Sequence, residues 1–239
     1  MLKPWAVGLL VVAVLGVGGA MFGVGGRIAD WRVDNTTVAE ERAMADATLR
    51  EIAGQASFLA ATDAEHQLVE RLGRRLVAVI PGGSRYSYRF HVIDEASINA
   101  FALPGGDVVV HRGLLRLLDR VEQLAAVLAH EIQHVEQQHG IRGYFHTQSA
   151  ATIIAWTFGL ASPDGTELAV YLKHAKYGRA LETDADLRGA QLLTQAGVDR
   201  AHMVTLLRKL AQAPGSRVPA WLSDHPDPLD RARRVEAAR

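Results

Sequence analysis

The sequence predicts a mostly helical α+β fold with a small antiparallel sheet, preceded by one N-terminal transmembrane helix. Three observations support this prediction: an uncharged stretch at residues 5–26, strand-like runs within residues 86–110, and apolar residues at helical spacing, above all in Val121–His139. The chain has 239 residues and is 49% hydrophobic, which suffices for one core of ordinary size. We therefore expect a membrane anchor with its junction at residues 1–34 and one folded domain at residues 35–239.

The charge balance and the absence of cysteine restrict which binding partners and which metal ligands the protein can have. Lys+Arg and Asp+Glu both number 26, so the formal net charge is zero, and a nucleic-acid partner is not expected. The chain has no cysteine, which excludes disulfides and thiolate ligands. Any bound metal must therefore be held by histidines and carboxylates.

The N-terminal segment Trp5–Gly26 contains no charged residue. As a helix rising ~1.5 Å per residue it would be about 33 Å long, enough to cross a bilayer. The alternative is a cleavable signal peptide, because Ala20 and Gly26 are small enough for a cleavage site. An uncleaved helix predicts a protein anchored in a membrane, and a cleaved signal peptide predicts a secreted protein. We favour the uncleaved anchor.

The first half of the folded domain reads as two helices followed by strands. The helices are expected over Thr37–Ala60 and from Thr62 to the break at Pro81, and strands over Tyr86–Ile93 and Val108–Val110. Between the strands lies the segment Asn99–Gly106, which ends in a Pro-Gly-Gly turn. It predicts either a plain hairpin or a sheet edge that pairs with an extended peptide, and the spacing does not decide between them.

The second half reads as helices apart from one proline-rich loop. Its final basic helix is expected to present its arginines to solvent. The expected segments are a short helix at 112–118, a buried or interfacial helix at 149–161, helices at 168–195 and 198–210, and the loop at 214–228.

The segment Val121–His139 carries the clearest chemical signal. At ~100° per residue its apolar side chains form one stripe, and His130 and His134 lie on the opposite side, one turn apart, with Glu131 beside them. Two histidines at this spacing can bind one zinc ion, and the glutamate can take a proton from water. Gly140 is the expected end of this helix.

A zinc site of this kind needs a third protein ligand. His139 is unsuitable because it returns to the apolar stripe, and Glu182 is favoured because Asp186, four residues later, shares its helix face. One carboxylate can bind the metal while the other holds a ligand imidazole by its free N–H. Small residues near that face would allow the helix of Glu182 to approach the helix of His130 and His134 closely. The downstream candidates considered are His139, His146, His174, Glu182 and His225.

Taken together, these motifs resemble the gluzincin metallopeptidases of the membrane-linked HtpX, CAAX prenyl protease and BepA type. The resemblance covers about residues 62–236. Two features depart from it, because the chain offers one membrane segment where some branches have several, and it has no helical repeat domain. The resembling segments are His130–His134, Glu182–Asp186, Asn99–Gly106, Gly113–Leu115, Tyr177–Arg179, and Ser223–Pro226 with Arg231.

The resemblance implies one Zn²⁺ per chain, bound by His130, His134 and Glu182. It implies that Glu131 is the general base and that Asp186 orients a ligand histidine. For His225 it implies a place at the metal cleft, either as a donor to the oxyanion, which we favour, or as a latch on the open zinc position. The substrate would lie extended along the sheet edge formed by Asn99, Ala100, Phe101, Ala102 and Leu103.

The expected function is zinc-dependent endopeptidase activity on unfolded or membrane-associated proteins, as part of protein quality control. The catalytic domain is expected on the periplasmic or other extracytoplasmic side of the membrane. The alternative function is a membrane-tethered chaperone or adaptor that binds unfolded chains with little proteolysis. An intact Glu131 argues against that alternative. The sequence does not predict an oligomeric state.

Overall fold

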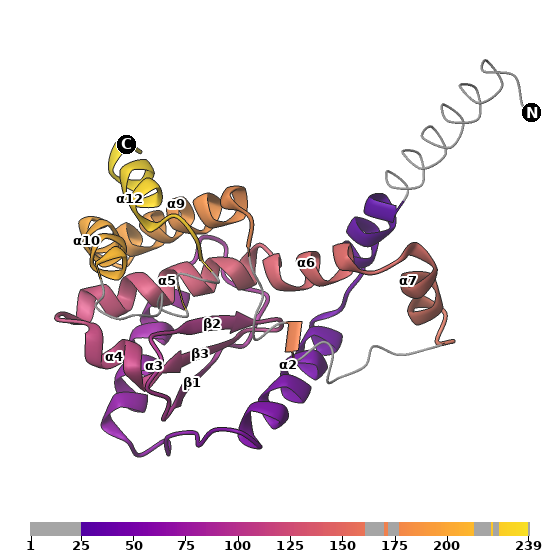
Figure 1. The fold of residues 1–239 in the computed structure, drawn as a ribbon, viewed down its shortest axis with the longest axis horizontal. Helices are drawn as coiled ribbons and strands as arrows, with labels where there is room; N and C mark the ends of the chain where they lie inside the picture. Colours follow the sequence, from indigo (N-terminus) through magenta and orange to yellow (C-terminus); the bar gives the residue numbers. More distant parts are fainter. Residues whose placement is uncertain (1–24, 161–169, 172–176, 213–220, 222–224, 239) are drawn as a thin grey trace, which may run out of the picture. The chain divides into compact units, whose positions relative to one another are not determined.

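The structure is a computed structural model that describes residues 25–160, 170–171, 177–212, 221 and 225–238 (Figure 1). It divides into two units, Met1–Thr36 with Arg142–Pro163, and Thr37–Ile141 with Asp164–Arg239. Of the predicted membrane segment, residues 5–24 lie outside the described part. Among the described residues, no helix is both long and apolar enough to cross a membrane.

The larger unit contains all three strands and most of the helices, and α6 runs across the boundary between the units. The named elements in chain order are α2 (Val38–Ala53), α3 (Ala64–Val77), β1 (Arg89–Ile93), β2 (Ala100–Leu103), β3 (Asp107–His111), α4 (Arg112–Leu117), α5 (Val121–Glu136), α6 (His139–Thr147), α7 (Ala150–Thr157), α9 (Arg179–Gln195), α10 (Ala201–Ala211) and α12 (Pro228–Ala237).

The sheet is mixed, which corrects the prediction of an antiparallel sheet. Its strand order is β1-β3-β2; β2 and β3 form the predicted antiparallel hairpin, but β1 pairs with β3 in parallel, with Phe90 opposite Val108. The chain leaves β1, reverses direction into β2, and returns through the hairpin so that β3 lies between the other two strands. Residue patterns predict that a segment such as Tyr86–Ile93 forms a strand but cannot tell which neighbour it will pair with.

Helix α5 lies between the sheet and the helices α9 and α10 (Figure 1). It is buried on all sides from Gln123 to Val135, because β2 and α3 cover one side and α9 and α10 cover another. Most of the predicted apolar stripe, including Leu128 and Ile132, faces the main core, but Val121 at its start is 47% exposed. The face predicted to be polar is buried as well, so the two motif histidines do not lie in open solvent.

Three helix boundaries differ from the predictions for identifiable local reasons. Helix α2 begins after Thr37, which forms a capping box with Glu40, and it ends at Ala53. Helix α5 ends at Glu136, because Gln138 adopts a left-handed conformation with φ of 55°, and α6 then begins. Helix α9 begins at Arg179, after Gly178 in an extended conformation. The expected stop at Gly140 therefore lies inside α6.

The smaller unit brings the helical residues 25–34 together with the second half of α6 and with α7. The Asp30 carboxylate accepts a hydrogen bond from Arg142 at 2.5 Å and lies 3.0 Å from His146. Helix α7 follows Ser149, whose hydroxyl accepts from the N–H of Thr152. This unit exposes several large apolar side chains, namely Trp31, Ile154, Phe158 and Leu160.

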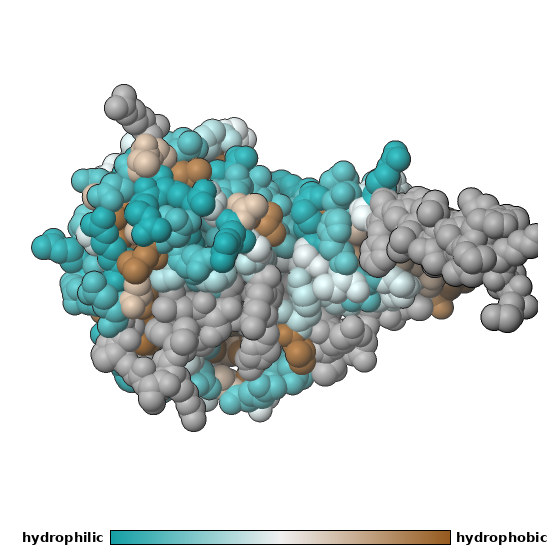
Figure 2. Space-filling view, turned by 45° about the horizontal axis from the view of Figure 1, so that its top comes forward, coloured by the Kyte–Doolittle hydropathy of each residue, from teal (hydrophilic) through white to brown (hydrophobic). Residues whose placement is uncertain are grey.

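The described surface is otherwise mostly hydrophilic on the face drawn in Figure 2, with hydrophobic residues in small separate areas. In the larger unit, the large apolar side chains that stay exposed are few among the described residues: Val121, Val170 and Leu229. This distribution is ordinary for a folded domain.

Candidate metal centre

Helix α5 supplies the first three functional side chains. His130 and His134 are 2% exposed and Glu131 is 0% exposed. They are buried because α9 approaches α5 closely at Gly189, where a Cβ atom would lie 3.3 Å from the backbone of Ala129. The small residue predicted on this face of α9 thus allows the contact that encloses the histidines.

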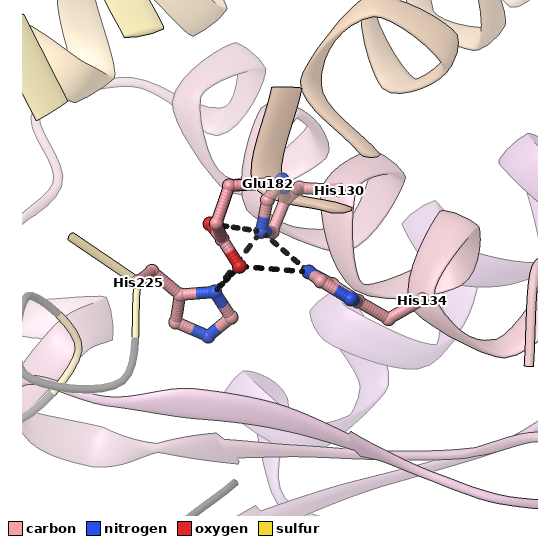
Figure 3. A group of neighbouring side chains, drawn as sticks. All are labelled: His130, His134, Glu182 and His225. Carbon is pink, nitrogen blue, oxygen red and sulfur yellow. Dashed lines mark hydrogen bonds and ion pairs between the residues drawn. The ribbon is translucent and has the colours of Figure 1, made fainter. Parts of the chain in front are cut away.

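Helix α9 supplies Glu182, and the loop before α12 supplies His225 (Figure 3). The Glu182 carboxylate lies 3.6 Å from His130 Nε2 and 3.5 Å from His134 Nε2. His225 Nδ1 lies 2.9 Å from Glu182 Oε1 and 3.2 Å from His130 Nε2. One potential ligand atom from each of these four residues lies within 4.8 Å of every other.

This spacing fits a tetrahedral zinc site. With Zn–N distances of about 2.0–2.1 Å, ligand atoms at the corners of a tetrahedron are about 3.3 Å apart. His130 Nε2 and His134 Nε2 are 3.0 Å apart, although neutral imidazole nitrogens that both carry lone pairs repel each other. A cation between them removes that conflict, and nitrogen and oxygen donors are those that zinc accepts.

The protonation of three of the four groups, His130, His134 and Glu182, suits metal binding. Burial lowers the pKa of His130, and it lowers that of His134 to about 4, so both rings stay neutral at pH 7. Burial alone would raise the pKa of Glu182, but the neighbouring His225 and His134 hold it well below the usual range of a carboxyl group. Neutral imidazoles and an ionised carboxylate are the ligand forms that zinc requires.

Glu131 is placed and charged differently from Glu182. Neither of its carboxylate oxygens accepts a hydrogen bond from the residues that the structure describes. The closest charged partner is His225 Nε2, at 3.7 Å. Burial raises the pKa of Glu131, which makes its carboxylate a better proton acceptor. A buried acceptor that is free of hydrogen bonds and lies beside the metal ligands is what a general base for water needs.

Asp186 orients the first histidine. Its Oδ1 lies 3.0 Å from His130 Nδ1, so it can accept the Nδ1–H and leave the lone pair of Nε2 directed at the site. On His134 the corresponding nitrogen is 3.0 Å from Nδ1 of His139, and the ring of Tyr177 stacks on the imidazole at 4.0 Å. His139 thus supports a ligand from behind and is not one of the four grouped residues.

Arg231 is buried, which corrects the prediction that the arginines of the final helix face solvent. Its guanidinium is 3% exposed, donates to both oxygens of Asp186 at 2.6 and 2.7 Å, and lies 2.7 Å from Glu182 Oε2. The prediction of a solvated arginine face holds for Arg233 and Arg234, which are exposed. The Ser-x-His-Pro block followed by an arginine was the only signal in the sequence that pointed to Arg231.

The predicted substrate-binding residues Asn99–Leu103 lie on and just before β2, at one edge of the sheet. Their side chains are all buried. The carbonyl of Ile98, next to this segment, accepts a hydrogen bond of 3.0 Å from the N–H of Trp221. The ring of Trp221 in turn stacks on His225 at 4.6 Å. The chain that carries His225 is therefore attached beside the beginning of β2.

Comparison with known proteins gives the same assignment. Residues 63–239 match the model of Peptidase family M48. The chain is 33% identical over 211 residues to the beta-barrel assembly-enhancing protease of Escherichia coli (strain K12), covering 82% of this chain and 43% of that protein. It is also 33% identical over 174 residues to the mitochondrial metalloendopeptidase OMA1 of Schizosaccharomyces pombe, covering 70% of this chain and 51% of that protein.

The chain thus spans about half the length of these relatives. The family match covers α5, α9 and the loop before α12, and with them all four residues of the metal cluster. The chain therefore belongs to peptidase family M48, and its buried cluster has the donors of that family's zinc site.

Proposed function

We propose that this protein is a zinc-dependent endopeptidase that hydrolyses peptide bonds of unfolded or membrane-associated proteins. The observation that carries the proposal is the buried carboxylate of Glu131, which accepts no hydrogen bond from the described residues and lies beside the His130, His134 and Glu182 donors. The names of the relatives, a protease that enhances β-barrel assembly and a mitochondrial metalloendopeptidase, support protein substrates.

Each residue of the site has a distinct role in the proposed reaction. His130, His134 and Glu182 hold zinc, which when bound polarises a substrate carbonyl and makes water more acidic. Glu131 accepts the proton of the attacking water, for which its raised pKa suits it. Asp186 keeps His130 in the tautomer that directs a lone pair at the metal, and Arg231 fixes Asp186 and Glu182 together.

An extended substrate would bind along β2. Edge strands present unpaired backbone groups that another chain can satisfy, and β2 is an edge strand next to the metal helix. Backbone pairing is independent of side chains, which suits substrates of varied sequence. This binding mode requires them to be unfolded, because a folded protein does not offer a free strand.

For His225 the geometry supports the latch over the oxyanion donor that sequence reasoning favoured. Nδ1 of His225 lies close to the donors of Glu182 and His130, so His225 could hold zinc as a fourth protein ligand and would then exclude water from that position. A substrate that pairs at the start of β2 competes with Trp221 for the carbonyl of Ile98. Because Trp221 and His225 are stacked, their displacement together would open the site.

The closed arrangement also favours a second candidate function, a membrane-tethered chaperone or adaptor that binds unfolded chains and cleaves little. In both cases we propose that residues 5–26 anchor the chain and that residues 35–239 lie on the extracytoplasmic side. The two functions differ in whether hydrolysis occurs, so one comparison separates them.

The test is proteolysis by the purified full chain in detergent, loaded with zinc, with casein as substrate. We expect slow cleavage that stops on chelation. Glu131→Gln keeps the shape of the side chain but cannot accept the proton, so it should retain zinc, measured by elemental analysis, and lose hydrolysis. Cleavage by this variant at the wild-type rate would exclude Glu131 as the base, and binding of casein without cleavage by the wild type would favour the chaperone.

A further inference from the structure

Glu41 on α2 is a buried carboxylate that lies outside the metal cluster. It is 1% exposed, yet its two oxygens together receive hydrogen bonds from three different parts of the chain. Oε1 accepts from Arg85, from the Tyr86 hydroxyl at 3.1 Å and from Gln138 Nε2 at 3.0 Å. Oε2 accepts from the backbone N–H of Gly105 at 3.1 Å. Burying a carboxylate is costly unless its acceptors are satisfied, and here they are.

The hydrogen bond to Gly105 connects α2 to the end of β2, the strand proposed to pair with the substrate. Gly105 lies in the turn between β2 and β3, with φ of +76°, and α2 lies beside this end of the sheet (Figure 1). A Cβ atom on Gly105 would come within 2.8 Å of the backbone nitrogen of Arg42, so the turn rests directly on the helix backbone. Glu41 therefore fixes where β2 ends, immediately after Leu103.

The bond to Gln138 ties the same carboxylate to the junction that follows the metal helix. Gln138 is one of two non-glycine residues with positive φ among those the structure describes, a conformation that needs support from its surroundings. The next residue, His139, contacts the metal ligand His134 through the two Nδ1 atoms, which are 3.0 Å apart. Glu41 thus supports the junction that holds His134 from behind.

The two attachments face each other across a small cavity. Its walls are the end of β2, with Ala102 and Leu103, and the end of α5, with His134 and Val135, and Glu41 and Gln138 both line it. One carboxylate therefore binds both the turn that follows β2 and the junction that follows α5.

We propose that Glu41 is a positioning residue that sets the alignment of the substrate edge β2 with the metal helix α5. The inference rests on the proposed binding of substrate along β2. Loss of this alignment weakens the binding of an extended chain in the ground state and in the transition state alike, so KM should rise while kcat is preserved.

The first test compares Glu41→Gln with Thr48→Ala in the full-length, zinc-loaded protein. The amide keeps the shape but replaces one acceptor oxygen with a donor that faces the donors around it. Thr48 is the matched control, because it is buried on the same helix and, among the described residues, its hydroxyl bonds only to the carbonyl oxygen of Met44 in that helix, at 3.1 Å. With casein as substrate, we expect Glu41→Gln to raise KM on the order of tenfold, with kcat within about twofold and zinc content unchanged. Thr48→Ala should leave KM unchanged.

A second variant covers the case in which Glu41→Gln does not fold. Gln138→Ala removes a single donor and leaves the carboxylate its other partners. It should raise KM in the same direction by a smaller factor. If the folded variants keep the wild-type KM, Glu41 has a purely structural role. The same conclusion follows if Glu41→Gln and Thr48→Ala have the same KM at equal loss of thermal stability.

A binding measurement separates this inference from the proposed catalytic function. Fluorescein-labelled unfolded casein is titrated with zinc-loaded Glu131→Gln protein, with and without Glu41→Gln, and Kd is read from anisotropy. A Kd that rises on the order of tenfold with the second substitution supports the positioning role even if no variant hydrolyses casein. An unchanged Kd overturns it even if hydrolysis is confirmed.

Discussion

Arg231 joins the two carboxylates of α9 to the loop of His225. Its planar guanidinium donates to both oxygens of Asp186, lies against Glu182, and reaches the carbonyl oxygen of His225 at 3.3 Å. A lysine can keep the charge but cannot form this forked contact. Arg231 therefore supports the metal site indirectly, through Asp186, Glu182 and the loop of His225.

We expect Arg231→Lys to lower zinc affinity on the order of 10–100-fold, the range typical for residues that support metal ligands. Competition with a chromogenic chelator measures this affinity. The control is Arg234→Lys on the same helix, because Arg234 is exposed and pairs only with Asp230 among the residues described. If both variants bind zinc as the wild type does, the pairing of Arg231 with Asp186 has no role in the site.

His225 decides whether the resting enzyme is closed. If its imidazole occupies the fourth zinc position, His225→Ala should weaken zinc binding modestly and increase casein hydrolysis several-fold, because a position for water opens. The rate is measured at saturating zinc so that occupancy is equal. A sharp fall in rate at full zinc occupancy would instead identify His225 as the oxyanion donor. The double variant Glu131→Gln, His225→Ala should be inactive, which assigns the cleavage to this site.

At the scale of elements, the packing of α3 on β1 depends on Gly73. A Cβ atom at this position would lie 2.2 Å from the Phe90 ring, which comes from β1. Overfilling a packed core typically costs about 1–3 kcal/mol, so Gly73→Ala should lower the free energy of unfolding by about that amount. Urea denaturation followed by circular dichroism measures the loss.

Gly54→Ala is the control for this substitution. Gly54 has an ordinary φ of −74° at the end of α2, and a Cβ atom there would be no closer than 3.4 Å to its neighbours. The variant should therefore not be destabilised. Equal stability of the Gly73 and Gly54 variants would show that the ring of Phe90 moves aside without cost.

At the scale of the whole molecule, the uncharged segment Trp5–Gly26 is expected to hold the chain in a membrane. Expressed in cells, the full chain should stay in the membrane fraction after a carbonate wash and should keep its own N-terminus, because 22 uncharged residues can span the hydrocarbon layer. N-terminal sequencing checks this. A first residue near Ala20 or Gly26 would indicate a cleaved signal peptide and a secreted protein.

The sequence alone determined those parts of the site whose members lie within one helix. His130, Glu131 and His134 are placed by the helical repeat, and so are Glu182 and Asp186, because residues four apart always share a face. The Pro-Gly-Gly turn predicted a hairpin or a sheet edge at residues 99–106, because turn geometry is local, and the structure shows that β2 both forms the hairpin with β3 and lies at the edge of the sheet.

The contacts between distant segments depend on the tertiary structure, and spacing within the sequence could only suggest candidates for them. The insertion of β3 between its neighbours, the arrival of His225 and Arg231 at the metal cluster, and the four bonds of Glu41 depend on how whole elements pack. Periodicity reports only that a face is apolar or polar, so it assigned Arg231 to solvent although two buried carboxylates hold it in the interior. The physical reason is that a buried charge is stabilised by partners far along the chain, which residue spacing within one element does not encode.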